Sequence, residues 1–196
     1  YLGSFDDTSN FYKPALVFYD KLSRSEKNIA EAASHEAGHN LGLSHDGTST
    51  LGYYRGHGTG ATGWAPIMGV GYDRPLVQWS KGEYLDANNR QDDFAVAQSN
   101  GLPLRADDHG NTAAGATPLT GDDNGGVTNA SVTGVIERST DVDAFEFSAA
   151  AGPLTLALRP ASRAANLDAV LELRDAAGSV LATSNPVDAL EADISI

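Results

Sequence analysis

The sequence predicts an α+β fold in two parts, a mixed domain over residues 1–105 and an all-β sandwich over residues 106–196. Between Ser25 and Gly42, apolar residues recur at the spacing of a helix that is buried on much of its surface. Beyond residue 106, short runs with alternating apolar residues are separated by turn-forming residues. Several short strands at regular spacing with such turns are typical of a sandwich.

In the first part, residues 14–20 (PALVFYD) predict a strand, because they are largely apolar, β-branched or aromatic. Ser25 is the expected N-cap of the following helix, with Glu26 in its first turn. Residues 53–71 are rich in glycine and predict an irregular loop. Ser80 and Glu83 have the spacing of a capping box, so a second helix is expected to begin there. Residues 94–97 predict a further helical stretch that ends near 100–101.

The second part contains only short predicted strands. The candidates are residues 131–136, 144–147, 154–158, 170–173, 180–182 and a last strand from 194 to 196. Residues 175–178 (DAAG) predict the turn of a hairpin between two of them. The final strand looks cut off as it starts, so we expect the sandwich to continue beyond residue 196.

Composition narrows the classes of partner. The 196 residues include 41% hydrophobic residues, enough for a packed core, and no apolar run approaches the roughly 20 residues of a membrane helix. The net charge is −13, of which residues 106–196 carry −10. This acidic surface argues against nucleic acid as a partner.

Cysteine is absent, which excludes disulfides and thiolate ligands. The sequence leaves the oligomeric state open.

One twelve-residue segment carries the chemistry, H-E-x-x-H-x-x-G-x-x-H-D from His35 to Asp46. On a helix, His35 and His39 lie about 40° apart around the axis and present their imidazoles on the same face. Glu36 lies beside a metal held there, and Gly42 can take the positive φ that turns the chain so that His45 becomes a third ligand. We therefore expect one catalytic Zn²⁺ with an open fourth position and Glu36 as the catalytic base.

The segment resembles the active site of the metzincin zinc metallopeptidases. Met68, in the sequence Ala-Pro-Ile-Met-Gly, stands where that family has the methionine of its Met-turn. The residues His39 to Gly42 and Asp46 resemble the reprolysin (adamalysin-like) branch, but Ile67 replaces that branch's usual cysteine. The absence of cysteine points to a bacterial relative rather than to the disulfide-rich animal enzymes.

The resemblance implies a secreted zinc endopeptidase that hydrolyses protein or peptide substrates. It also implies that the first part holds the active-site helix, the Met-turn and the C-terminal helix of a metzincin catalytic domain whose N-terminal part is missing. In this reading residues 1–4 are the tail of a substrate-binding edge strand, and residues 70–79 line a substrate pocket. Val70 stands where some branches have a zinc-side tyrosine, so Tyr72 is not assigned that role.

The second part is similar to the bacterial pre-peptidase C-terminal domain, a β-sandwich often appended to secreted peptidases. The similarity rests on residues 141–147 (DVDAFEF), which resemble a characteristic strand entry of that domain. Acidic residues in its loops also suggest Ca²⁺, since carboxylate oxygens are hard ligands. The candidate calcium ligands are Asp107, Asp108, Asp122, Asp123, Asp141 and Asp143.

Two alternatives remain open at this stage. The chain is a non-catalytic zinc-containing binding or adhesion module of a secreted protein, or it is a cell-surface β-sandwich protein in which the motif is coincidental. The intact Glu36 favours an enzyme over the first alternative, and zinc analysis separates the second. The two remaining histidines, His57 and His109, lie in loop-like sequence and are expected to be solvated.

Overall fold

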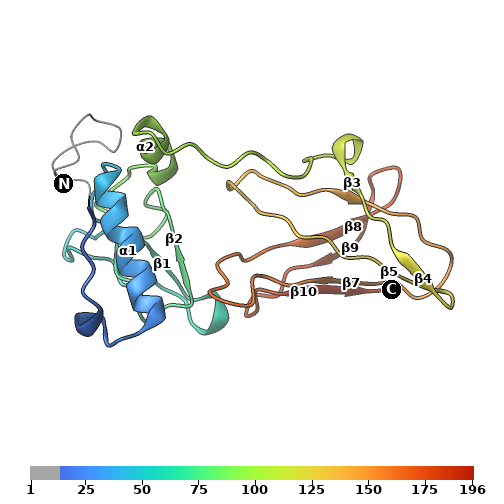
Figure 1. The fold of residues 1–196 in the computed structure, drawn as a ribbon, viewed down its shortest axis with the longest axis horizontal. Coiled ribbons are helices and arrows are strands. Elements are labelled where there is room, and N and C mark those ends of the chain that lie inside the picture. The colour runs from blue at the N-terminus through green and yellow to red at the C-terminus, as the bar shows by residue number, and fades with distance from the viewer. Residues whose placement is uncertain (1–13) are drawn as a thin grey trace. The chain divides into compact units, whose positions relative to one another are not determined.

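The computed structural model describes residues 14–196 and shows a mixed α+β chain (Figure 1). The expected edge strand at residues 1–4 lies outside the described residues. The chain divides into two compact units. The first runs to Pro103 and includes Arg159–Ala169 and Pro186–Glu191; the second comprises Leu104–Leu158, Val170–Asn185 and Ala192–Ile196. No helix among the described residues is long and apolar enough to cross a membrane.

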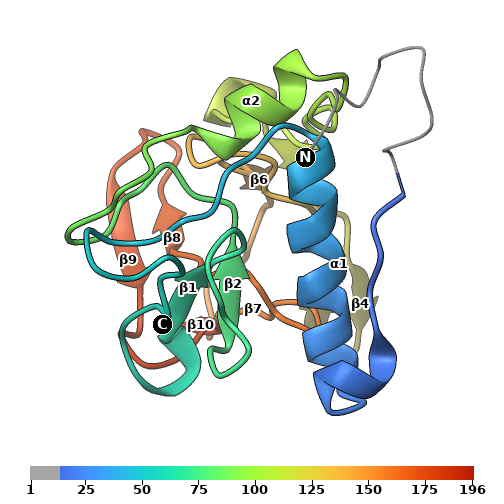
Figure 2. The ribbon, with the colours of Figure 1, turned by 90° about the vertical axis from the view of Figure 1, so that its left-hand side faces the viewer.

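The first unit is built around one long helix. A 3₁₀ turn, Tyr19–Leu22, precedes α1, Glu26–Asn40, and a second 3₁₀ turn spans Gly60–Thr62. The strands β1, Trp64–Pro66, and β2, Leu76–Gln78, pair in parallel, and α2 spans Asp93–Ser99. Figure 2 shows α1 alongside this small sheet. Among the described residues, the buried apolar side chains of the unit are Leu41, Leu43, Ala65, Pro66, Met68, Leu76, Val77 and Tyr84.

Local signals define both ends of α1. The Ser25 hydroxyl accepts a hydrogen bond from the Asn28 amide (3.4 Å), which confirms the predicted N-cap. At the other end, the Leu43 amide donates to the Gly38 carbonyl and the Gly42 amide to the His39 carbonyl. These two bonds form a Schellman motif, and Gly42 has the expected positive φ of 90°. The helix therefore stops where the motif needs the chain to turn.

The prediction that α1 is buried on much of its surface is wrong. Gly38 is its only buried residue, Ile29 and Ala32 are half-buried, and Ala30 and Ala33 are exposed. The structure describes only a small two-stranded sheet beside the helix, so much of its apolar surface has no second layer over it.

Two other predictions for the first unit are wrong. Residues 14–18 form no strand and lead into the 3₁₀ turn, because no described strand pairs with them and an unpaired strand is not stable. No helix begins at Ser80. Its amide donates to the Asp93 carboxylate and its hydroxyl to Asp46, so neither group closes a capping box. Gly82 also has a φ of 73°, which is not helical. The helix expected at residues 94–97 is confirmed as α2, which ends before Asn100.

The second unit consists of short strands in two-stranded sheets, after a 3₁₀ turn at Ala113–Gly115. Strand β3, Thr117–Pro118, pairs in parallel with β6, Phe145–Glu146. Strand β4, Asp122–Asn124, pairs antiparallel with β5, Val127–Asn129. Strand β7, Thr155–Leu158, pairs antiparallel with β10, Ala192–Ser195. Strand β8, Leu171–Arg174, and β9, Val180–Ser184, form the predicted hairpin, with Gly178 at φ 85°.

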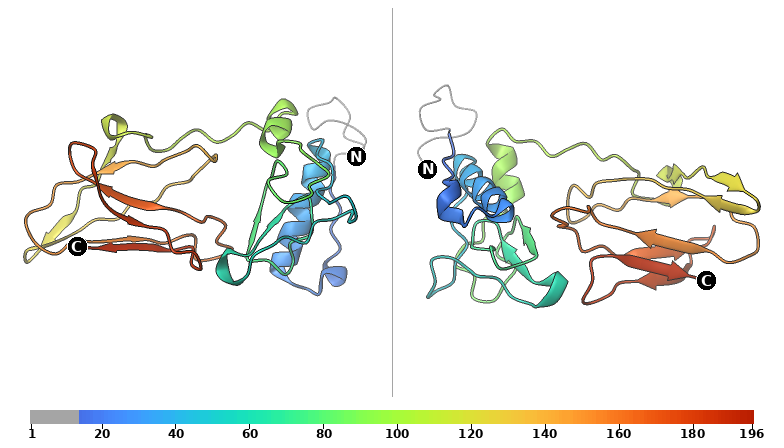
Figure 3. Two further views of the ribbon diagram at one scale, coloured as in Figure 1. Left: turned by 180° about the vertical axis from the view of Figure 1, so that it is seen from behind. Right: turned by 60° about the horizontal axis from the view of Figure 1, so that its bottom comes forward.

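Strand β10 also contacts β8 and β9, and these orange and red strands lie side by side in both views of Figure 3. Leu173, Ala192 and Ile194 are the buried apolar residues of this group. The prediction of a strand at residues 131–136 is wrong, because these residues form none. Polar side chains bind its backbone instead, since the Thr133 carbonyl contacts His109 and the Val135 amide donates to Asp108. The short strands β1 to β5 were not predicted. Residues 53–71 were expected to be an irregular loop, which is wrong where they form β1 and the 3₁₀ turn at Gly60–Thr62.

Candidate metal centre

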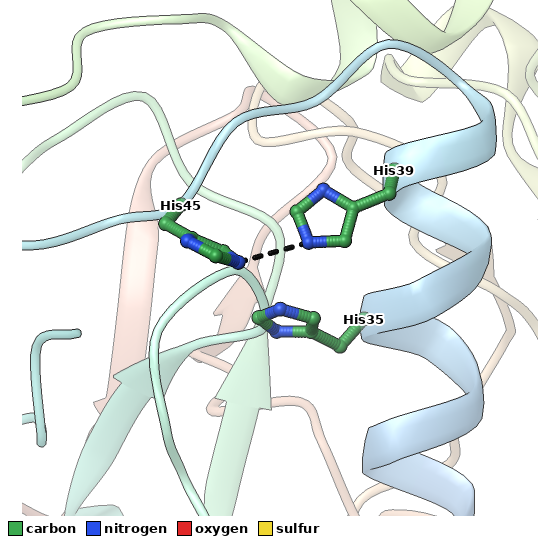
Figure 4. Close-up of side chains that lie close together, drawn as sticks. All are labelled: His35, His39 and His45. Atoms are coloured by element: carbon green, nitrogen blue, oxygen red, sulfur yellow. Dashed lines mark hydrogen bonds between the residues drawn. The ribbon is translucent and has the colours of Figure 1, made fainter. Parts of the chain in front are cut away.

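The three histidines of the motif meet at one point (Figure 4). His35 and His39 project from the same face of α1, and the turn at Gly42 brings His45 opposite them. The ring centroids are 4.9 Å apart for His35 and His39, 5.2 Å for His35 and His45, and 4.7 Å for His39 and His45. One nitrogen of each ring lies within 4.8 Å of the other two.

Backbone contacts determine which nitrogen of two rings is available. His35 Nδ1 lies 2.8 Å from the Ile67 carbonyl oxygen, and His39 Nδ1 lies 2.9 Å from that of Leu43. A carbonyl oxygen only accepts, so each Nδ1 carries the proton and each neutral ring has its lone pair on Nε2. Metal-binding histidines are oriented in this way by hydrogen bonds from their second nitrogen.

The Nε2 atoms of His39 and His45 lie within hydrogen-bond distance of each other (Figure 4), a spacing that also suits a small cation. His39 Nε2 and His45 Nε2 are 2.9 Å apart. Two nitrogens at tetrahedral positions, each about 2.0–2.1 Å from zinc, are about 3.3 Å apart. The two rings are therefore close to the separation that one shared zinc ion requires.

The surroundings favour neutral, metal-binding rings. Burial is the largest cause that lowers the pKa of His35, against the hydrogen bond to Ile67, which raises it. Burial also lowers the pKa of His45, followed by the neighbouring His39 and His35. Since a protonated imidazole cannot bind a metal, these shifts keep the ligands available at lower pH than for free histidine.

Two tyrosines lie close to this centre. The Tyr53 ring is 4.3 Å from the His45 ring and 6.2 Å from the His35 ring, centroid to centroid, and it is 47% exposed. Burial raises the pKa of Tyr72, with further contributions from Glu31 and Glu36, so Tyr72 lies in the electrostatic field of the motif carboxylate. Tyr72 belongs to residues 70–79, which were expected to line a substrate pocket, whereas no signal in the sequence marks Tyr53.

Met68 is fully buried and lies against α1 at Gly38. A Cβ atom built on Gly38, which lies between the two histidines of α1, would come within 2.5 Å of Met68 Sδ and 3.2 Å of Trp79 Cζ3. The helix therefore approaches the Met68 turn as closely as a glycine allows. This contact, together with the His35 bond to the Ile67 carbonyl, ties the metal ligands to the segment that contains Met68.

A buried polar network holds the third histidine from below. Asp46, 1% exposed, accepts hydrogen bonds from the Ser80 hydroxyl (2.7 Å) and from Asn89 Nδ2 (3.1 Å). Its backbone amide donates to the Met68 carbonyl (2.8 Å). Burial raises the pKa of Asp46, and the two side-chain hydrogen bonds oppose that rise. Asp46 therefore connects His45 to the Met68 turn and to the segment before α2.

The structure brings together some, but not all, of the proposed calcium ligands, and it shows the surroundings of the two histidines outside the motif. Four of the six proposed calcium ligands, Asp107, Asp108, Asp141 and Asp143, belong to groups of carboxylates within reach of one cation. Asp122 and Asp123 are exposed on β4 and belong to none of the groups found among residues 14–196. His57 is exposed and bonds to the Tyr54 hydroxyl. His109 is half-buried with both ring nitrogens bonded, so the expectation that it is solvated is wrong.

Comparison with known proteins identifies no relative. No protein-family model, no curated protein and no solved structure matches this chain. The chemistry of the site therefore has to be argued from its own geometry.

Proposed function

We propose that the chain carries the active site of a secreted zinc-dependent endopeptidase, and that Glu36 is its general base. The observation that carries the proposal is the convergence of His35, His39 and His45, two of them with Nδ1 bonded to backbone carbonyls. Three neutral imidazoles are a catalytic rather than a structural donor set, because they leave one of four tetrahedral positions for water.

The residues present fit zinc. All three donors are imidazole nitrogens, which suit zinc better than the hard cations calcium and magnesium. When bound, zinc supplies a water of pKa near 7 and polarises the substrate carbonyl. The chain's own residues do the rest. Glu36 follows His35 on α1, and its charge raises the pKa of the His35 and His45 rings, so it lies within electrostatic reach of the ligands. Its assigned role is to accept a proton from the attacking water and return it to the leaving amine.

Other residues of the centre hold or surround these groups. Asp46 and the segment that contains Met68 are hydrogen-bonded to each other and hold the ligands, while the exposed Tyr53 ring packs against His45. The substrate class that fits is a protein or peptide, because the proposed chemistry attacks an amide carbonyl. The finer fold assignment is part of this proposal. The first unit would be the C-terminal part of a metzincin domain of the reprolysin-like type, and the second a β-sandwich of the bacterial pre-peptidase C-terminal type.

The test combines hydrolysis of casein or gelatin with zinc analysis of the same samples. Glu36→Gln should keep its zinc and lose about 10²–10⁴-fold in rate, the usual contribution of a general base. Glu26→Gln is the matched control, since Glu26 is an exposed carboxylate on the same helix and should leave the rate unchanged.

The outcomes separate the candidate functions. Activity that survives in Glu36→Gln would refute the assigned role of Glu36. Stoichiometric zinc in a wild-type protein without hydrolysis would indicate a non-catalytic zinc-binding module. Absence of zinc would leave the histidine cluster without its proposed role.

A further inference from the structure

The second unit contains a cluster of five carboxylates that the zinc site does not use. Asp107, Asp108 and Glu137 each place an oxygen within 4.8 Å of the others, and so do Asp107, Asp141 and Asp143. Asp107 belongs to both groups, so the two groups adjoin each other. Glu137 was not among the candidates from sequence, because it stands alone between Ile136 and Arg138.

Glu137 is the observation that distinguishes this cluster from an ordinary acidic surface. The residue is only 7% exposed, and its Oε2 atom is buried with no hydrogen-bond partner. Asp143 Oδ1 is likewise buried without a partner. A buried carboxylate oxygen without a donor is costly, and here it also faces other carboxylates. A cation bound among these carboxylates would reduce both the cost of burying these oxygens and the repulsion between the charges.

The backbone brings the two acidic segments together. The Ala144 amide donates to the Gly110 carbonyl (3.0 Å), and the Thr117 amide donates to the Ala144 carbonyl (2.8 Å). The Val142 amide donates to Asn111 Oδ1 (2.6 Å). These bonds accompany the parallel pairing of β3 with β6, which places the residues before each strand at one end of the pair. The cluster is therefore positioned by the fold rather than by flexible side chains alone.

Hydrogen bonds also orient individual carboxylates. Asp107 Oδ1 accepts from the His109 amide (3.1 Å) and its Oδ2 from Asn111 Nδ2 (2.6 Å). Asp108 Oδ1 accepts from the Val135 amide (3.3 Å), and Asp141 Oδ2 accepts from the Glu137 amide (3.1 Å). Asp108 thus uses one oxygen in the protein and keeps the other for a ligand, while the Asp141 carboxyl group also lies within hydrogen-bond reach of the Glu137 side chain.

Gly134 shows how closely the chain packs around the cluster. A Cβ atom at this position would clash with Asp143 Oδ2 and would lie 2.9 Å from His109 Cδ2. Only glycine gives the Asp143 carboxylate this space. The same His109 ring is held by Thr117 and by the Thr133 carbonyl, so it forms a fixed wall and contributes no nitrogen to the cluster.

We propose that Asp107, Asp108, Glu137, Asp141 and Asp143 form a calcium site that stabilises the second unit. The donors are all carboxylate oxygens, whereas zinc and copper prefer nitrogen and sulfur ligands. Several carboxylates around one position suit Ca²⁺, which takes six to eight oxygen ligands in flexible geometry, whereas Mg²⁺ keeps most of its waters. The proposal is independent of the zinc site, because none of these residues belongs to it.

The experiment is a calorimetric titration of Ca²⁺ into the metal-depleted protein, with thermal melting of the same samples. The wild type should bind calcium with a Kd below about 1 mM, and calcium should raise the melting temperature. The double variant Asp107→Asn/Glu137→Gln should bind at least about tenfold more weakly, because ligand charge sets affinity. The matched control Asp122→Asn/Asp123→Asn makes the same change in charge outside the cluster and should bind like the wild type.

Two further controls keep the result interpretable. Without calcium, Asp107→Asn/Glu137→Gln should melt close to the wild type, because weaker repulsion between carboxylates offsets the hydrogen bond that Asp107 loses. Weak binding then cannot be attributed to unfolding. His39→Ala should retain calcium binding. The proposal is overturned by absence of binding at about 5 mM calcium, above the range of extracellular calcium modules. Equal weakening in both double variants would also overturn it, since that would indicate attraction to the overall acidic charge only.

Discussion

The turn at Gly42 gives a sharp test of how the chain builds its metal site. The residue has a φ of 90°, and its amide and that of Leu43 close the end of α1 before the chain returns to His45. Gly42→Ala puts a side chain at this left-handed position. The strain is local, yet it acts on the one turn that determines where the third ligand lies.

The magnitude follows from two opposing effects. An L-residue in the left-handed region costs about 1–2 kcal/mol. Alanine also restricts the unfolded chain, which offsets about 0.4–1 kcal/mol of that cost. The net loss of unfolding free energy should be about 1 kcal/mol. The metal-free variant can relieve this strain by loosening the turn. Zinc binding must then re-form the strained turn, and the same free energy lowers the zinc affinity by up to about fivefold.

The assay is chemical denaturation of the metal-free protein together with zinc competition against a chromophoric chelator. Gly42→Asn should lose less than Gly42→Ala, because asparagine tolerates positive φ. Gly52→Ala is the matched control in the same region, since a Cβ atom there meets nothing within 4 Å. If Gly42→Ala is as harmless as Gly52→Ala, the turn does not control the third ligand.

Three further predictions concern packing, pH and metal. Gly38→Ala should lower the unfolding free energy by about 1 kcal/mol, because overpacking against Met68 Sδ at 2.5 Å outweighs the better helix propensity; an unchanged denaturation midpoint would contradict this. Burial raises the pKa of Asp93 to about 7, so the folded state keeps a proton that the unfolded chain releases, and stability falls from about pH 4 to about pH 7 by at most about 4 kcal/mol. Asp93→Asn should flatten this part of the stability profile of the metal-free protein, and a persisting slope would exclude Asp93 as its source. Chelation should lower the melting temperature of the first unit, and zinc should restore it in the wild type but not in His39→Ala.

The successful predictions depend on short stretches of sequence. The N-cap at Ser25, the turn at Gly42 and the end of α2 near Asn100 were predictable, because each requires contacts only within a few residues along the chain. The convergence of the three histidines belongs to the same class, since one helix and one turn position all of them.

The failures arise where distant residues compete for the backbone. Ser80 has the sequence of a helix start, but Asp46 and Asp93 take its hydroxyl and amide. Residues 131–136 alternate like a strand, but Asp108 and His109 bind their backbone. Tyr53 and Glu137 were missed for a related reason. Their significance comes from neighbours far along the chain, and no spacing in the sequence marks them.

The central claim is that three histidines hold one zinc ion and leave a position open for water. Zinc K-edge absorption spectroscopy of the zinc-loaded protein measures this directly. The account predicts one zinc per chain with three imidazole nitrogens and one further oxygen at about 2.0–2.1 Å, and the loss of one imidazole in His45→Ala. A zinc ion with fewer than three imidazoles, or a spectrum that His45→Ala leaves unchanged, would contradict it.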